Sequence, residues 1–247
     1  MPSVTEMLYA LDLGDRVVGV TSNCNYPSAV KKKEKIGGFF LNLEKVVSLK
    51  PDLVVMLEDA QKRDVEKFKN FGLPVCAINA RSVTEVMDGL LKLGEVTGKK
   101  RKAEQLVSSM KSRITAVKPR RFSLLFVLKL PKVLAVVGYR PLIVVGGGTF
   151  IDDIIRNAGA ENVAGKTRAA YPHYSFEELV REDPEYIIIA EGTIGKEEIR
   201  RDRRWQGLDA VKKGRVLFMD ADVLSRPGPR VVDAIDGIAR FINEKKT

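Results

Sequence analysis

A stretch near the N-terminus of the chain recurs later with an offset of 133 residues, and this repeat restricts the fold more than any other sequence feature. Each copy carries a glutamate at the start of a short helical segment, then a proline that stops the helix, then an apolar run typical of a buried strand. The two copies are LEKVVSLKPDLVVM (residues 43–56) and FEELVREDPEYIII (residues 176–189). Two similar α/β lobes are therefore predicted.

Strands and helices alternate along the whole chain, which favours mostly parallel sheets covered by helices. The Ser-x-x-Glu spacings at Ser3 and Ser82 predict capping boxes that start two of the helices. Strands are predicted at 16–20, 53–56, 74–78, 122–128, 133–137, 142–145, 186–190 and 215–219. Helices are predicted from Ser3 to near Gly14 and from Ser82 to near Gly98, and at 43–49, 61–71, 100–117, 149–158, 175–181, 196–201, 205–211 and 229–244.

The helix at 100–117 is the longest predicted element, roughly 27 Å at 1.5 Å per residue. It divides the chain into an N-terminal α/β lobe (1–98), a bridging helix (99–118) and a C-terminal α/β lobe (119–247). Two lobes joined in this way place a ligand cleft between them.

Composition excludes several classes of protein. Hydrophobic residues make up 45% of the chain and charged residues 30%, so disorder, a collagen-like fibre and a disulfide scaffold are excluded. The net charge of +10 favours anionic partners. The basic clusters are dispersed, interleaved with acids and lack an aromatic stripe, so we expect solvated helix ends rather than a nucleic-acid surface.

Catalytic and metal-binding patterns are absent from the sequence. His173 is the only histidine, and Cys24 and Cys76 have no metal-site spacing and no need to form a disulfide. We therefore expect no enzyme, no catalytic residue, no protein-bound metal and no cofactor. One alternative is an α/β enzyme of the cytoplasm that binds a phosphate-bearing ligand at the glycine turn Gly146–Thr149. A tight strand-to-helix turn is the simpler interpretation of that run.

Aromatic and arginine residues gather on loops, in the segments 26–27, 39–40, 171–174 and 226–230. Aromatic faces pack against large rigid ligands, and arginines pair with carboxylates, phosphates or catecholates. Taken together, these loops favour ligand binding without chemistry.

At these residues the chain resembles the solute-binding proteins that deliver ferric siderophores, haem or vitamin B12 to ABC importers. The resemblance covers nearly the whole chain in a fixed order of blocks, each of which is weak alone. The blocks are PSVTE (2–6), VGVT (18–21) with Tyr26-Pro27, GG (37–38) with NLEKVVSLKPDLV (42–54), GGGTFI (146–151), AGAENVA (158–164), SFEEL (175–179) and RPGPR (226–230).

The resemblance implies two lobes joined by one stiff helix with limited closure, and a monomer that partners a membrane permease and carries a metal chelate. Glu44 and Glu177 match the glutamates with which the family docks onto permease arginines. The implied ligand contacts are Tyr26, Phe39, Tyr171, Arg168, Arg226 and Arg230. Phe39 and Tyr171 stand near tryptophans of the B12 binder, and the arginines suit an anionic ferric chelate, so cobalamin and a ferric siderophore are equally favoured over haem. Arg226 and Arg230 have an alternative role at a helix start.

Family members carry a strand before the block PSVTE, at which this sequence opens. The N-terminal lobe is therefore expected to lack its first strand within residues 1–98. Either Met1 is not the true start, and the strand and an export signal are expected upstream, or the protein has lost this strand. Periplasmic or cell-surface localisation follows from the resemblance.

Overall fold

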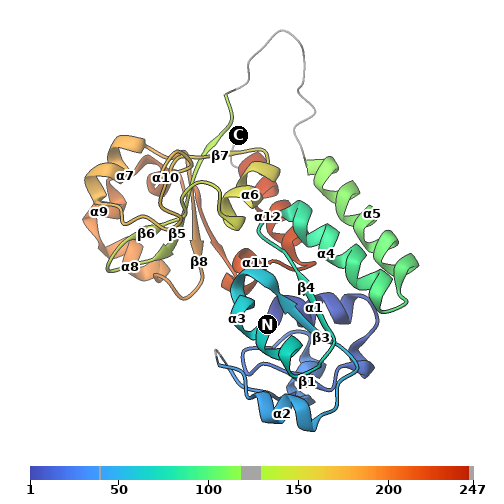
Figure 1. Ribbon diagram of the computed structural model, residues 1–247. Helices are drawn as coiled ribbons and strands as arrows, with labels where there is room; N and C mark the ends of the chain where they lie inside the picture. Colours follow the sequence, from blue (N-terminus) through green and yellow to red (C-terminus); the bar gives the residue numbers. More distant parts are fainter. Residues whose placement is uncertain (39, 118–128, 245–247) are drawn as a thin grey trace. The chain divides into compact units, whose positions relative to one another are not determined.

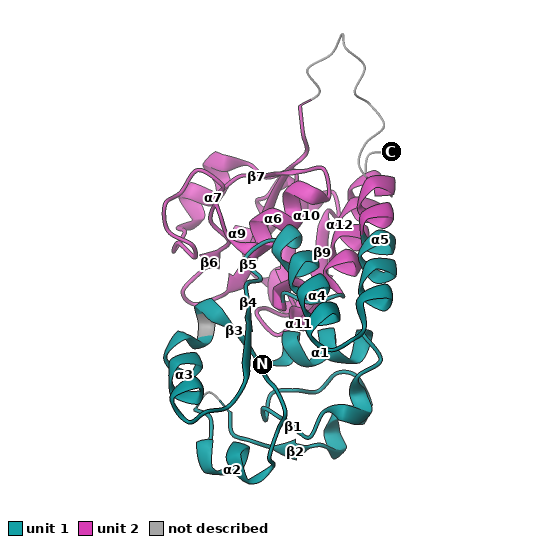
Figure 2. Cartoon of the chain, turned by 45° about the vertical axis from the view of Figure 1, so that its right-hand side comes forward, with its two compact units in different colours: residues 1–110, 227–229 teal, residues 111–226, 230–247 magenta. Residues whose placement is uncertain are grey.

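The computed structural model describes residues 1–38, 40–117 and 129–244, and Figure 1 labels its helices and strands. The chain forms two compact units (Figure 2). Unit 1 comprises residues 1–110 and 227–229, and unit 2 comprises residues 111–226 and 230–247. The boundary between them falls within α5 (Lys100–Val117), which spans the same residues as the predicted long helix. The predicted strand at 122–128 and the predicted contact residue Phe39 lie outside the described residues.

Unit 1 is an α/β unit with two parallel strand pairs. Strand β1 pairs with β2, and β3 pairs with β4 in the register Val54↔Val75. Buried Met56 and Phe68 form the centre of a small core between the β3–β4 pair and two helices. The elements of the unit are α1 (Pro2–Ala10), β1 (Gly19–Val20), β2 (Glu34–Lys35), α2 (Leu43–Ser48), β3 (Val54–Leu57), α3 (Glu58–Asn70), β4 (Val75–Ile78) and α4 (Val83–Val96).

A cavity of about 330 Å³, partly open to solvent, is lined by residues of unit 1. Its lining includes the segment 18–21 around β1, the segment 53–55 around β3, and Met1, Val4 and Leu8 of the first helical segment. Within the described part of the chain, β1 pairs only with β2 and β3 only with β4. Backbone N–H and C=O groups alternate in direction along a strand, so each of these strands turns half of its polar groups away from its partner. The cavity is therefore bounded on two sides by the edges of parallel strands.

Unit 2 contains a five-stranded sheet in the order β6-β5-β8-β9, with β7 also pairing with β5. All pairs are parallel except β5–β6. The elements are β5 (Lys132–Gly138), β6 (Ile143–Val144), α6 (Phe150–Asn157), β7 (Glu161–Asn162), α7 (Phe176–Glu182), β8 (Tyr186–Ala190), α8 (Lys196–Arg201), α9 (Arg203–Gln206), α10 (Asp209–Lys212), β9 (Val216–Met219), α11 (Ala221–Ser225) and α12 (Val231–Glu244).

Strand β8 is buried along its whole length because both faces of the sheet are covered. On one face Ile187 and Ile189 join a core that includes Trp205, which is fully buried. On the other face Tyr186 donates a hydrogen bond to the carbonyl oxygen of Ile242 in α12 at 3.2 Å. Alternate residues of one strand therefore serve two layers of helices. The chain has the predicted fold class, two α/β units with mostly parallel strands.

The internal repeat is a structural repeat as well. Asn42 and Ser175 cap α2 and α7, each by accepting a hydrogen bond from the backbone N–H three residues later. Lys50 and Asp183, which are also 133 residues apart, both adopt a positive φ, 47° and 42°. The helix–proline–strand unit predicted from the sequence is thereby confirmed in both units.

Three helix predictions are wrong. Ser3 was expected to cap the first helix, but α1 begins at Pro2 and has no side-chain cap. Proline is favoured in the first turn because its missing N–H has no partner there in any case. The predicted helix at 205–211 is two short helices, α9 and α10. At Ser82 only half of the capping box forms, because Glu85 accepts from the N–H of Arg81. Among the residues that the structure describes, no helix combines the length and apolar character of a membrane span.

Candidate functional site

The segment 164–174 of unit 2 carries two of the predicted ligand contacts on a fixed backbone. It runs beside β6 and is held there by hydrogen bonds between main-chain groups. Gly146 N–H donates to Ala170 O at 2.8 Å, Val144 N–H donates to Pro172 O at 3.1 Å, and Tyr174 N–H donates to Leu142 O at 3.0 Å. Because its backbone is bonded at several points, the segment presents its side chains in a defined arrangement.

Arg168 and Tyr171 are both exposed on this segment, and 52% of Tyr171 is accessible to solvent. A guanidinium and an aromatic ring three residues apart offer charge and a flat apolar face to a large anionic ligand. The structure thus brings these two predicted residues onto one surface segment. Their role as ligand contacts stays a prediction.

The glycine turn at 146–148 is explained by close packing of this segment. A Cβ on Gly146 would overlap the carbonyl oxygen of Ala169, and one on Gly147 would overlap that of Gly165. Gly148 has a φ of 71°, which disfavours other residues. The glycines are therefore required by the approach of two backbones.

The same turn does not offer a phosphate cradle. The N–H of Gly146 already donates to Ala170 O, and the N–H of Gly148 donates to the carboxylate of Asp152 at 3.0 Å. That carboxylate is an anion at the start of α6, where a phosphate would have to bind, and like charges repel. The alternative function at Gly146–Thr149 therefore has no structural support.

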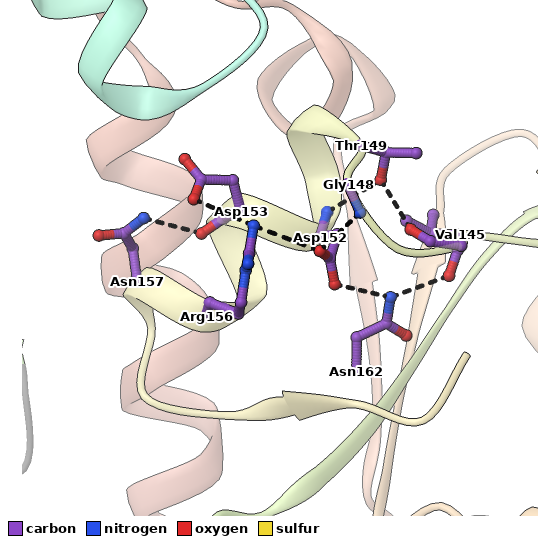
Figure 3. A network of polar contacts seen from close by, with 9 residues as sticks. Val145, Gly148, Thr149, Asp152, Asp153, Arg156, Asn157 and Asn162 are labelled. Atoms are coloured by element: carbon purple, nitrogen blue, oxygen red, sulfur yellow. Dashed lines mark hydrogen bonds and ion pairs between the residues drawn. The ribbon is translucent and has the colours of Figure 1, made fainter. Parts of the chain in front are cut away.

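A buried polar network holds this turn in place (Figure 3). Asp152, which is 4% exposed, accepts from Gly148 N–H and from Asn162 Nδ2 at 3.0 Å each. Asn162 also donates to Val145 O at 3.0 Å and accepts from Ala164 N–H at 3.2 Å. This network was not predicted from the sequence, although an aspartate three residues after the cap Thr149 is a visible signal. The network connects β6, α6, β7 and the start of the 164–174 segment.

The predicted contact Tyr26 of unit 1 lies on a loop with a buried anchor. Cys24 and Val30 are buried with Val20, and the Cys24 Sγ lies 3.3 Å from Thr5 Oγ1. Tyr26 itself is 48% exposed. The segment between β2 and α2 carries Phe40, which is 84% exposed and was not among the predicted ligand contacts.

Arg226 has a structural partner. Its guanidinium forms an ion pair with Asp222 of α11 at 2.8 Å, and its side chain is only 14% exposed. Arg230 directly precedes α12 and is half-buried, and its carbonyl accepts from Asp233 N–H at 2.9 Å. The position of Arg230 fits the alternative role at a helix start, whereas Arg226 lies at the C-terminal end of α11, a helix that was not predicted.

The predicted docking residues Glu44 and Glu177 are both exposed, each at the second position of its helix. Beside Glu177, Phe176 packs edge-on against Trp205 at 5.3 Å between ring centroids, which anchors α7 in the core. Hydrogen bonds from its own backbone N–H and from Ser175 hold the pKa of Glu177 below its usual value. The carboxylate is therefore charged at neutral pH.

Asp202, near this helix, has a carboxyl group whose pKa is strongly lowered. It forms a bidentate contact with Arg204, with the shorter distance 2.6 Å, and accepts from Tyr139 Oη at 3.0 Å. The Arg204 hydrogen bonds, followed by that of Tyr139, hold the pKa of Asp202 well below its usual value. The guanidinium of Arg204 lies 4.3 Å from the centroid of the Phe176 ring.

Neither cysteine forms a disulfide: Cys24 and Cys76 are buried free thiols. Burial raises the pKa of Cys76, which makes it a weak nucleophile. The described residues hold no group of three or more His, Cys, Asp or Glu side chains placed to bind a metal ion.

Comparison with known proteins identifies the family. Residues 1–223 match the family model described as periplasmic binding protein. An uncharacterized ABC transporter substrate-binding lipoprotein of Bacillus subtilis, YvrC, is 35% identical over 98% of this chain and 78% of its own length. A vitamin B12-binding protein of Vibrio parahaemolyticus is 25% identical over 99% of this chain and 88% of its own length.

A solved structure agrees with these relatives. A possible iron-binding (periplasmic solute-binding) protein of Staphylococcus epidermidis superposes with a TM-score of 0.81 and 27% identity, covering 98% of this chain and 96% of that one. The two α/β units, the structural repeat and these matches lead to one conclusion. The chain belongs to the periplasmic binding protein family, the solute-binding components of ABC importers.

Proposed function

We propose that this protein captures a metal chelate outside the cytoplasm and delivers it to the permease of an ABC importer. The observation that carries the proposal is the repeated short helix with an exposed glutamate in its first turn. Glu44 and Glu177 occupy equivalent exposed positions in the two units of a chain that belongs to this family. One carboxylate on each unit suits a partner built from two similar halves. A periplasmic or cell-surface location belongs to the same proposal.

The proposed ligand is cobalamin or a ferric siderophore. Relatives named for vitamin B12 and for iron support both classes. Arg168 and Tyr171, held on the 164–174 segment of unit 2, supply a cation and an aromatic face. The iron or cobalt atom would arrive within its chelator, so the protein needs to recognise only the outer surface of the chelate.

A binding panel tests this proposal. The purified protein is titrated with cyanocobalamin, a ferric hydroxamate, a ferric catecholate, haem and ATP, and the shift in thermal unfolding is measured for each. A ligand at 100 times its dissociation constant stabilises the folded protein by about 2.7 kcal/mol, which is a readily measured shift. Stabilisation by cobalamin or a ferric chelate is expected, whereas stabilisation by ATP alone would refute the proposal.

A matched pair of variants shows where the ligand binds. Arg168→Ala and Tyr171→Ala should weaken chelate binding while leaving the unfolding temperature of the unliganded protein unchanged, because both side chains are exposed. Lys166→Ala, on the same segment and also exposed, is the control. Equal affinities for all three variants would exclude this segment as the contact surface.

A further inference from the structure

Each repeat helix exposes an apolar residue besides its glutamate. Val47 on α2 is 43% exposed and Val180 on α7 is 58% exposed. Each valine lies three residues after the glutamate of its helix, Glu44 or Glu177. Residues three apart are neighbours on the surface of a helix, so each helix presents a carboxylate beside an isopropyl group.

The two valines occupy equivalent places in the fold. They are 133 residues apart, the offset of the repeat, and both helices begin directly after a capping residue, Asn42 or Ser175. The residue before each valine points the other way: Val46 is 4% exposed and Leu179 is fully buried. The inward and outward positions of α2 and α7 therefore coincide one by one.

Other charges on these helices already have local partners. Lys45, which follows Glu44, pairs with Glu34 at 3.0 Å. Glu178, which follows Glu177, accepts from Ser175 N–H at 2.8 Å in the capping box. Ser48 and Arg181 are exposed at a further equivalent position but differ in chemistry, so the exposed residues of the same type on both helices are the glutamate and the valine.

A single exposed valine needs no explanation, because folded proteins expose many apolar atoms. The same pair at equivalent positions of two units with otherwise different surfaces is harder to assign to chance. Valine is also a poorer helix former than the straight-chain polar residues, so it does not stabilise these short helices. Its restricted rotamer makes it a contact that loses little entropy on binding.

We propose that Glu44 with Val47, and Glu177 with Val180, form two equivalent docking tips for the importer's permease. Each tip fits a recess that combines an arginine guanidinium with an apolar wall. The valine excludes water from the rim of the ion pair, which lowers the local dielectric and strengthens the charge interaction. This inference rests on the proposed function and adds an apolar half to the contact.

The test measures binding of the protein to the importer's permease–ATPase complex, purified into nanodiscs. Val47→Ser with Val180→Ser removes both isopropyl groups, and serine matches valine closely in helix propensity. The control double variant, Val96→Ser with Leu130→Ser, removes one exposed apolar side chain from each unit away from the tips. Circular dichroism and thermal unfolding verify that both variants fold.

The valine double variant should bind about tenfold more weakly than the control. Its dependence on salt should match that of the wild type, because the carboxylates remain. Glu44→Lys with Glu177→Lys, measured alongside, should fail to bind the permease–ATPase complex even at low salt, where the wild type binds most tightly. If the glutamate variant loses binding but the valine variant binds like its control, the apolar half of the tips is refuted and the proposed function stands. If neither variant loses affinity, docking by these helices is refuted altogether.

Discussion

Removing the carboxylate of Asp152 should destabilise unit 2 by about 2–5.5 kcal/mol. In Asp152→Ala the buried amide of Asn162 loses one acceptor, which costs about 1–3 kcal/mol. The N–H of Gly148 loses its acceptor as well, at about 0.5–1.5 kcal/mol because Gly148 is exposed and water can replace the carboxylate. Losing a negative charge from the first turn of α6 adds about 0.3–1 kcal/mol.

The control for this prediction is Asp153→Ala. Asp152 and Asp153 both pair with Arg156, at 3.4 and 3.5 Å, so each variant removes one partner of the same guanidinium. Arg156 is 59% exposed, and such pairs contribute little. The control should therefore lose less than about 1 kcal/mol, which separates the buried network from the surface ion pair.

Urea unfolding at neutral pH, followed by tryptophan fluorescence, measures the effect. Trp205 is the single tryptophan and is buried in the core of unit 2, so the signal reports on that unit. The midpoint should fall in Asp152→Ala with an unchanged slope. A loss below about 0.5 kcal/mol, or no larger than that of Asp153→Ala, would show that the network in Figure 3 does not hold the turn.

Three further changes have defined outcomes. Arg113 of α5 pairs with Asp233 at 2.7 Å and with Asp236. Because the arginine is 41% exposed, Arg113→Met should reduce the free energy of unfolding, measured in urea, by only about 1 kcal/mol. A loss above about 3 kcal/mol would contradict this. The lowered pKa of Asp202 contributes stability that is present above the unfolded pKa of about 3.9 and is lost as pH falls through the acid range. Asp202→Asn should therefore flatten the acid side of the stability profile; an unchanged profile would exclude this contribution. An extension of four or five β-branched residues before Met1 should occupy the cavity between the strand pairs of unit 1 and raise the melting temperature by about 4 °C or more. The same extension with central prolines is the control and should not raise it. Equal melting temperatures for the two extensions would show that the cavity does not accept a strand.

Much of the fold follows from local sequence signals. The repeat, the prolines at 51 and 184 and the caps Asn42 and Ser175 each act within a few residues, so they can be recognised in the sequence alone. The bounds of α5, α8 and β8 agree with the predicted ranges for the same reason. Two-residue strands such as β2 and β7 were missed, because pairing with distant residues creates them rather than any local preference.

In the candidate site, too, features set by local sequence were predicted and contacts between distant residues were not. The sequence pointed to Arg168, Tyr171 and the two glutamates as residues on loops or helix starts, and the structure exposes all four. It could not show that Asn162 reaches Asp152 from β7, since no spacing rule connects a strand residue with a helix start across a turn. It also could not show that Arg226 pairs with Asp222, because α11 is a short helix without a strong pattern.

Chelate uptake into proteoliposomes tests the central claim most directly. The permease–ATPase complex is reconstituted with ATP inside the vesicles, and the chelate that binds in the panel is supplied outside in radiolabelled form. Uptake should require this protein, and Glu44→Lys with Glu177→Lys should abolish it while leaving chelate affinity unchanged. Full uptake with that double variant, or uptake that does not depend on the protein at all, would contradict the account.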